Sequence, residues 1–135
     1  MNLEEQIRFY CPNFPSEKLK VSRLDQIDFK NMERGVLFIF ATWSGSSVVS
    51  FKLLCDALMS AGERTSFPLY VVDIDEINSE SFKQNWSHSL NGNGETMWIK
   101  GGTLVAFDIG YTDKRDRVLQ NSDMLRERIA LLKSP

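Results

Sequence analysis

The feature that most restricts the fold is an apolar strand that runs almost directly into an amphipathic helix. Residues 36–40 read Val-Leu-Phe-Ile-Phe, a β-branched and aromatic run that is typical of a strand covered on both faces. Residues 44–47 read Ser-Gly-Ser-Ser, and serine favours the start of a helix. Apolar residues then recur at three- and four-residue spacing from Val48 to Met59. A buried strand joined to a helix in this way predicts a layered α/β domain.

Residues 1–34 predict one short helix and an irregular lead-in. Residues 3–10 carry apolar side chains at helical spacing, and Pro12 and Pro15 then break the pattern. Residues 16–31 mix apolar and charged side chains irregularly. This mixture favours a strand followed by a turn or two of helix.

Glycine and asparagine breaks separate the elements in the rest of the chain. The predicted elements are a buried strand at residues 68–75, a helix at 79–90, two hairpin strands at 96–100 and 103–109 joined by Gly101-Gly102, and a C-terminal helix from Met124 capped within residues 121–123. Trp86 and Trp98 fall at inward positions, where large aromatic side chains pack into a core. From residue 35 the order is strand, helix, strand, helix, strand, strand and helix, which predicts helices on a mixed sheet.

Size and charge restrict the number of domains and the class of partner. The chain has 135 residues, of which 42% are hydrophobic, and it contains no linker-like run, so we expect a single domain over residues 1–135. Sixteen basic and eighteen acidic residues give a net charge of -2. This balance lacks the positive field that a phosphate backbone requires, and we expect no nucleic-acid partner.

The charged and apolar patterns also restrict the cellular compartment of the protein. Glu4 and Glu5 stand where an export signal needs positive charge followed by an apolar run. The longest apolar run, residues 35–41, is too short to span a bilayer. We therefore expect a cytoplasmic protein without a membrane partner.

The two cysteines and the one histidine lack the spacing of a metal site. Cys11, Cys55 and His88 are far apart in the sequence, so we expect neither a metal nor another cofactor. Cys55 falls on the apolar stripe of a predicted helix, and Cys11 stands directly before Pro12. Reduced thiols are the ordinary state of such residues in the cytoplasm. The sequence leaves open whether the two form a disulfide.

Two segments resemble the thioredoxin family, with the best register over residues 35–132. The strand that leads into Ala41-Thr42-Trp43 is similar to the family's approach to its Trp-Cys-Gly-Pro-Cys motif, with Trp43 and Gly45 retained. The segment Thr96-Met-Trp-Ile-Lys-Gly-Gly resembles the family's Pro-Thr-hydrophobic run that ends in Lys-Asn-Gly. The resemblance implies a thioredoxin-like fold, a central mixed β-sheet flanked by helices, with Trp43 at the surface.

The chain departs from the family at four positions that carry its chemistry. Ser44 and Ser47 stand where the two redox cysteines would be, and a serine hydroxyl cannot form or exchange a disulfide. Phe38 replaces a buried aspartate that transfers protons, and Glu95 replaces the cis-proline. Since a non-proline cis bond costs roughly 3 kcal/mol, we expect a trans peptide before Glu95. These four departures together predict a redox-inactive domain.

The serines of the turn have a structural use that needs no ligand. Hydroxyls and free backbone N–H groups at a helix start can hold an anion or a carboxylate. We favour instead Ser44 or Ser46 as the N-cap of the helix. A serine nucleophile would need a base, and the resemblance places His88 away from this turn. We therefore expect no catalytic residue.

These features predict a non-catalytic thioredoxin-like protein-binding domain. Its expected contact surface comprises the exposed indole, its small neighbours and the loop before the hairpin, namely Trp43, Ser44, Gly45, Ser46, Ser47, Glu95 and Thr96. An assembly chaperone or adaptor with one client and an immunity protein that neutralises a toxin both fit. The alternatives are a thiol-disulfide oxidoreductase that uses Cys11 or Cys55, and a structural module that forms a homodimer.

Overall fold

A computed structural model describes residues 1–62 and 67–135. In chain order its elements are α1 (Leu3–Tyr10), η1 (Ser16–Lys18), β1 (Leu19–Val21), η2 (Leu24–Gln26), β2 (Arg34–Phe40), α2 (Gly45–Ser60), β3 (Leu69–Asp73), η3 (Ile74–Glu76), α3 (Ser79–Trp86), β4 (Thr96–Lys100), β5 (Thr103–Asp108), β6 (Tyr111–Thr112), β7 (Gln120–Asn121) and α4 (Met124–Lys133). The η elements are single turns of 3-10 helix.

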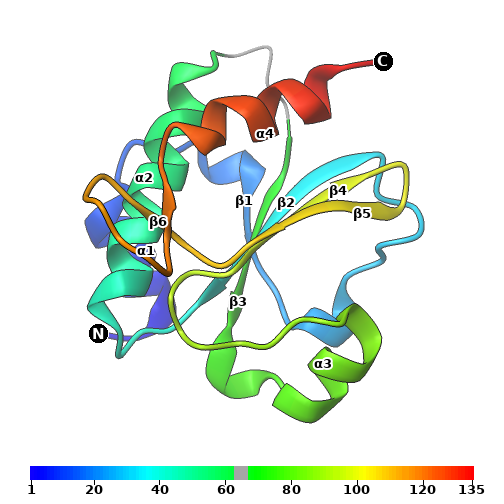
Figure 1. Cartoon of the computed structure of the whole chain (residues 1–135), viewed down its shortest axis with the longest axis horizontal. Coiled ribbons are helices and arrows are strands. Elements are labelled where there is room, and N and C mark those ends of the chain that lie inside the picture. Colours follow the sequence, from blue (N-terminus) through cyan, green and yellow to red (C-terminus); the bar gives the residue numbers. More distant parts are fainter. Residues whose placement is uncertain (63–66) are drawn as a thin grey trace.

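The main sheet has its strands in the order β1-β3-β2-β4-β5 (Figure 1). β3 pairs in parallel with β1 and β2, whereas β4 pairs antiparallel with β2 and with β5. β6 and β7 form a small separate pair. The predicted mixed sheet is therefore confirmed, with β2 at its centre.

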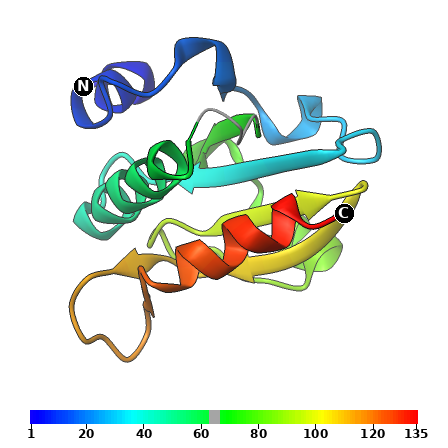
Figure 2. The same cartoon turned by 90° about the horizontal axis from the view of Figure 1, so that it is seen from above.

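Two apolar cores, one on each face of the sheet, explain the apolar composition of β2. On one face Phe38 packs with residues of α1, α2 and α4, among them Phe51 and Ile129. On the other face Leu37 packs with Phe82 of α3. Figure 1 shows α2 and α4 on one side of the strands and α3 on the other, and Figure 2 shows α4 running along β4 and β5. Because both faces are covered, residues 36–40 are fully buried.

Several predicted elements are confirmed closely. The first helix has the predicted bounds, and the side chain of Asn2 caps it by accepting the N–H of Glu5. The hairpin turns at Gly101 and Gly102, whose φ angles are 59° and 73°. Such positive φ values favour glycine in a tight hairpin turn. Trp98 is fully buried, as predicted.

The helix predicted at residues 79–90 is shorter than expected. It ends at Trp86, because Ser87 adopts a left-handed conformation with φ 59° and donates its N–H to the carbonyl of Lys83. Trp86 is half-buried and makes an edge contact with Phe29, so its predicted place in the core is wrong in part. The left-handed conformation of Ser87 therefore ends the helix and turns the following residues away from its axis.

The C-terminal helix forms as predicted, but its predicted cap is wrong. Asp123 is the N-cap residue, and its side chain makes no capping hydrogen bond. The side chain of Asn121 instead accepts the N–H of Asp123 at 2.9 Å. That bond fixes the turn before α4 and leaves the first turn of α4 uncapped by a side chain.

The end of α4 is attached to the start of β2 and the end of β4. Lys100 donates to the carbonyl of Leu131 at 3.2 Å, and Arg34 donates to the carbonyl of Ser134 at 3.4 Å. Cations at a helix C-terminus are stabilised by the helix dipole. Since Arg34 begins β2 and Trp43 follows its end, the end of α4 lies at the opposite end of β2 from the turn.

Candidate functional site

Trp43 combines high exposure with a fixed position. Its side chain is 64% exposed, yet the indole N–H donates to Asp75 Oδ1 at 3.2 Å. The six-membered part of the ring lies against Gly92, where an added Cβ would come within 2.5 Å of Trp43 Cη2. Asp75 lies in η3, after β3, and Gly92 lies in the loop before β4, so two separate segments hold the indole. The predicted surface position of Trp43 is confirmed.

The serines near the turn hold the start of α2 in place. Ser44 is the N-cap, and its Oγ accepts the N–H of Ser47 at 3.4 Å, which confirms one of the two predicted caps. Ser47 Oγ accepts the N–H of Ala41 at 2.9 Å. Both hydroxyl oxygens therefore serve the transition from strand to helix.

Ser50 is a further structural serine that the sequence interpretation missed. Its Oγ donates to the carbonyl of Asn93 at 2.7 Å and accepts the N–H of Tyr111 at 2.8 Å. Ser44, Ser47 and Ser50 follow one another at three-residue spacing and so share one side of the helix. That spacing was the signal in the sequence that could have identified Ser50.

The carboxylate of Glu95 closes the loop before β4. Its Oε2 accepts the N–H of Asn91 at 2.5 Å, and its backbone carbonyl accepts the N–H of Ile39 at 2.9 Å. No cis peptide bond occurs in the described residues, so the predicted trans peptide before Glu95 is confirmed. The side chain of Glu95 therefore folds back onto its own loop.

The accessible surface is smaller than the predicted contact surface. Ser47, Glu95 and Thr96 are fully buried, so their side chains are not accessible to a partner in this structure. Their hydrogen bonds turn them inward, since Thr96 Oγ1 donates to the carbonyl of Gly94 at 3.0 Å. The predicted residues that remain accessible are Trp43, Gly45 and Ser46, together with the half-buried Ser44.

Phe38 of β2 belongs to a buried aromatic cluster. The rings of Phe38, Phe40 and Phe51 pack with centroid separations of 5.1 to 5.6 Å. An added Cβ on Gly94 would come within 3.0 Å of Phe38 Cζ, so the ring also reaches the loop before β4. This apolar packing provides no group that could transfer a proton to the turn.

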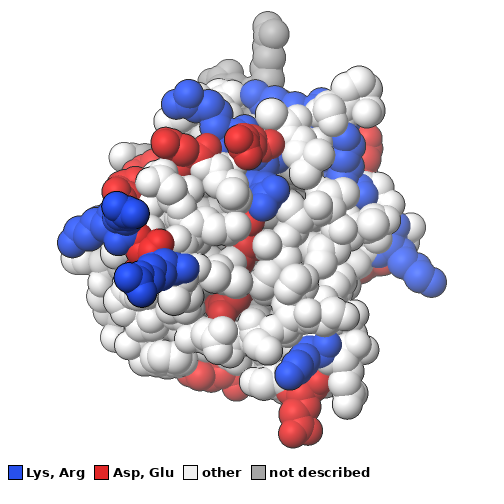
Figure 3. All heavy atoms as spheres, in the orientation of Figure 1, with Lys and Arg blue, Asp and Glu red and all other residues white. Residues whose placement is uncertain are grey.

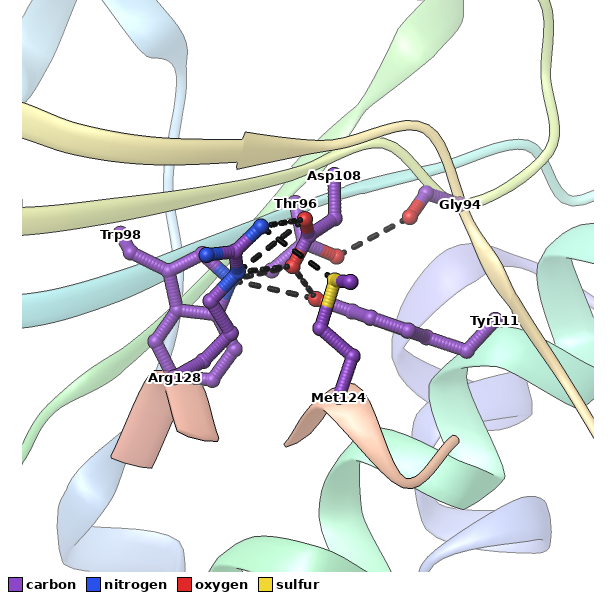
Figure 4. A network of polar contacts seen from close by, with 7 residues as sticks. All are labelled: Gly94, Thr96, Trp98, Asp108, Tyr111, Met124 and Arg128. Carbon is purple, nitrogen blue, oxygen red and sulfur yellow. Dashed lines mark hydrogen bonds and ion pairs between the residues drawn. The ribbon is translucent and has the colours of Figure 1, made fainter. Parts of the chain in front are cut away.

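A buried polar network crosses from the hairpin to α4, and the sequence interpretation missed it (Figure 4). Arg128 donates to both oxygens of Asp108, with Nη2 at 2.8 Å from Oδ1 and Nε at 3.0 Å from Oδ2. Trp98 Nε1 at 3.1 Å and the Tyr111 hydroxyl at 2.5 Å also donate to Asp108 Oδ2. The polar tips of Trp98 and Tyr111 were the available signal, because buried indole and phenol groups require partners.

The two thiols lie in the core on the α2 side of the sheet. Cys55 is fully buried and Cys11 is 6% exposed, and both are free cysteines. Burial raises the pKa of Cys55 well above its usual range, and the neighbouring Cys11 thiol raises it further. Raised pKa values disfavour the reactive thiolate.

The first helix adjoins the turn. Gln6 is almost fully buried, and its Nε2 donates to the carbonyl of Thr42 at 3.2 Å. Thr42 directly precedes Trp43, so α1 contacts the backbone that carries the indole.

Charge and metal-ligating groups give little further indication of a ligand. In the described ranges no three His, Cys, Asp or Glu side chains gather as metal ligands, and no helix there is long and apolar enough to cross a bilayer. Figure 3 shows basic and acidic side chains mixed around one face, with a broad uncharged area between them. On this face the mixed distribution does not favour a ligand of either charge.

Several solved structures resemble the chain over most of its length. The thioredoxin of Malassezia sympodialis aligns with a TM-score of 0.61 at 17% identity, covering 87% of this chain and 95% of that one. The thioredoxin of Fasciola hepatica gives 0.55 at 21% identity, covering 84% and 99%. A chain from a study of thiol resolution in yeast mitochondrial 1-Cys peroxiredoxin via the glutathione and thioredoxin systems gives 0.60 at 18%, covering 84% and 95%.

These likenesses establish the fold alone. The chain has the thioredoxin-like fold, with the central mixed sheet flanked by helices that the sequence predicts. No protein-family profile and no curated protein sequence matches the chain.

Proposed function

We propose that the chain is a non-catalytic thioredoxin-like protein-binding domain whose contact surface centres on Trp43. The supporting observation is that Trp43 is 64% exposed while Asp75 of η3 and Gly92 of the loop before β4 hold its indole in place. A large aromatic side chain that is already fixed loses little conformational entropy when a partner covers it. Such residues are typical anchors of protein interfaces.

The turn itself is proposed to carry no thiol chemistry. Ser44 and Ser47 have hydroxyls in place of thiols, and both hydroxyl oxygens accept backbone hydrogen bonds. Phe38 offers no proton beneath them. A serine at these positions has no thiolate to attack a disulfide. These features support binding over catalysis.

The central test is the Trp43→Ala variant in affinity capture from lysate, followed by mass spectrometry. We expect a partner that the wild-type chain retains to be lost. Because Trp43 is mostly exposed, we expect the melting temperature to fall by no more than a few degrees, as for other surface substitutions. Unchanged capture would show that the contact surface lies elsewhere.

Leu131→Ala is the matched control. Leu131 is 37% exposed and lies at the opposite end of β2, where its carbonyl accepts from Lys100. This variant also removes exposed apolar area and should leave capture intact. Loss of the same partner in both variants would indicate general destabilisation instead of a local contact.

Two biological roles remain within this proposal. An assembly chaperone or adaptor would hold one client protein, whereas an immunity protein would neutralise a toxin. A captured enzyme precursor encoded in the same operon would support the first role. Rescue of cells that express a neighbouring toxin gene would support the second, and its failure would exclude that toxin as the partner.

The alternative function is a thiol-disulfide oxidoreductase that uses Cys11 or Cys55. Burial of both thiols argues against rapid exchange with a substrate. We expect no reduction of insulin disulfides above that of a Cys11→Ser, Cys55→Ala double variant. Turnover above this control would favour the enzyme.

A structural module that dimerises through another surface is the third hypothesis. It predicts a dimer in sedimentation that persists in Trp43→Ala. A monomer at all accessible concentrations would count against it, and a dimer lost in Trp43→Ala would instead place the self-contact at the indole.

A further inference from the structure

The connection between β5 and α4 carries an exposed loop with unpaired cations. Residues 113–118, called the basic loop below, are all exposed, and β6 and β7 pair at its base. The carboxylate of Asp116 accepts the N–H of Val118 at 2.7 Å. The carboxylate of Asp113 accepts the hydroxyl of Ser122. The cations of the loop, which make no ion pair with any described residue, are Lys114, Arg115 and Arg117. The acids of the loop are therefore occupied within the chain, whereas its cations are available to a partner.

The basic loop adjoins the loop before β4, which also touches the indole of Trp43. Gly92 lies against the six-membered part of that indole. The next residue, Asn93, contacts Gly110 directly before β6, because an added Cβ on Gly110 would overlap the carbonyl oxygen of Asn93. Figures 1 and 2 show the basic loop, coloured orange, on the same side of the molecule as the start of α2. The exposed indole and the exposed cations therefore lie on one side of the molecule.

Acidic side chains adjoin the N–H edge of the indole. Asp75 Oδ1 accepts the indole N–H of Trp43 at 3.2 Å, and Asp73 Oδ1 accepts the N–H of Asp75 at 2.9 Å. Glu76 follows and forms an ion pair with Arg23 at 3.5 Å. No described cation pairs with Asp73 or Asp75, so the basic loop does not reach the acids of its own chain. This surface therefore carries acids next to the indole and cations beyond the loop before β4.

We propose that this surface binds a second copy of the chain in a symmetric dimer that covers Trp43. A two-fold axis brings the same surface of both copies together. With the axis near the indole, the basic loop of one copy meets Asp75 and its acidic neighbours on the other copy, and the same contact occurs twice. Opposite charges then face each other around a central aromatic residue, as in complementary protein interfaces. The dimer does not depend on the proposed function, although both use the same indole.

The charge pattern favours a second copy over a polyanion. Anionic membranes attract clusters of about four to eight basic residues, which is more than the basic loop carries. The backbone of a nucleic acid is negative along its whole length, and Asp75 beside the indole would repel it. A second copy supplies positive and negative charge at matching positions. Because exposed ion pairs are individually weak, the charges set the orientation of the dimer, and burial of the exposed Trp43 and Val118 supplies affinity.

Sedimentation equilibrium of the wild-type chain is the first test. We expect dimers in low salt, with a dissociation constant that rises about tenfold between about 0.05 M and about 0.5 M salt, since salt screens the charge pairs. Trp43→Ala should be monomeric. A monomeric wild type at every accessible concentration, or a dimer that salt does not weaken, would overturn the proposal. Partner capture needs only one copy, so a monomeric wild type that still loses its partner in Trp43→Ala would leave the proposed function intact.

Charge reversal tests the two halves of the contact. The first variant is Lys114→Glu, Arg115→Glu and Arg117→Glu, and the second is Asp75→Lys and Glu76→Lys. Each variant alone should be monomeric, because like charges then face each other. An equimolar mixture should form a heterodimer. In it the reversed loop of the first variant meets the reversed acids of the second, and the other contact keeps its native charges.

The control is the double variant Lys30→Glu and Lys133→Glu, which reverses two exposed lysines away from this surface and should dimerise as the wild type does. Circular dichroism checks that each variant is folded. If the second variant fails to fold, the salt dependence and the first variant still decide, because the cations of the basic loop have no partner among the described residues. A dimer that survives reversal of the basic loop, or a mixture of folded variants that does not associate, would contradict the proposed contact.

Discussion

At the scale of residues, the turn before α2 shows serine hydroxyls in structural roles. Ser44, Ser47 and Ser50 share one side of α2, and their hydroxyl oxygens bond to the helix start, the end of the strand, the loop before β4 and the start of β6. Each hydrogen bond contributes about 1 kcal/mol, and each buried oxygen would cost more if it were left unpaired. The serines are therefore explained by folding, which leaves Trp43 as the distinctive exposed group.

The buried Tyr111 predicts a loss of stability in alkali. Burial, followed by the charge of Asp108, raises the pKa of Tyr111 well above its usual value of 10.0. Above about pH 10 the unfolded state releases this proton while the folded state keeps it, so stability falls with pH, by at most about 1.4 kcal/mol per pH unit. Below that pH the contribution is fully present.

Urea unfolding of wild type and Tyr111→Phe between about pH 7 and pH 11 measures this effect. The variant should be about 1 to 2 kcal/mol less stable near neutral pH, because the Tyr111 hydroxyl donates to Asp108. The gap should narrow above about pH 10, where only the wild type has this phenol to ionise on unfolding. A difference in stability between wild type and variant that stays constant with pH would contradict the raised pKa of Tyr111.

Residue identities in the site were predictable where they follow a local pattern. The exposure of Trp43 and the Ser44 cap followed from motif position and from helix-start chemistry. The pairing of Asp108 with Arg128 was not predictable, because it joins a strand to a helix that pack together only in the folded chain. The inward direction of Glu95 likewise depends on the loop that it closes.

At the scale of elements, the hairpin illustrates a turn set by both backbone and surroundings. Gly101 and Gly102 both have positive φ, so any side chain is strained at either position. Only Gly102 is also crowded, since an added Cβ would lie 2.5 Å from the carbonyl oxygen of Lys30. The lead-in segment therefore packs against one residue of the turn and not the other.

Alanine at each glycine separates the two effects. Gly101→Ala should lower the free energy of unfolding by about 1 kcal/mol, because it adds backbone strain alone. Gly102→Ala should cost at least about 1 kcal/mol more, because the contact with Lys30 is with backbone. If chemical denaturation gave the same loss in free energy of unfolding for both variants, the backbone at Lys30 would be able to move away from residue 102 without cost.

The observed element boundaries differ from those that the sequence predicts where contacts with other elements decide them. The apolar spacing that continued to Leu90 predicted a longer third helix, but the chain turns at Ser87. Directly after that turn, His88 stacks on Phe107 with a centroid distance of 4.0 Å and an interplanar angle of 1°. Contact with β5 thus replaces further helical turns, and periodicity within one segment carries no information on such a contact.

At the scale of the whole molecule, the order of elements was enough to predict the architecture. The apolar composition of β2 required cover on both faces, and the two cores supply it. The alternation of strands and helices then left few arrangements compatible with short connections. The order of elements could not predict which polar groups meet in the interior, because the contacts of Asp108 with Trp98 and Arg128 join separate elements of the chain.

This architecture predicts a gradient of hydrogen-exchange protection across the sheet. Amides of β2 and of its neighbours β3 and β4 should exchange most slowly, since they lie inside the sheet between two cores. The edge strand β1 spans only Leu19–Val21 and should exchange earlier. Exchange measured by mass spectrometry or NMR would contradict the picture if β1 were as protected as β2.

The attachment of α4 at the far end of β2 has a practical consequence for any fusion or immobilisation. Ser134 is bound to Arg34 and Lys100, whereas Gln6 of the first helix contacts the turn that carries Trp43. Figure 1 shows the two ends of the chain at opposite sides of the molecule. A surface-bound tether at Pro135 should therefore leave the indole facing solution, while one at Met1 would crowd it.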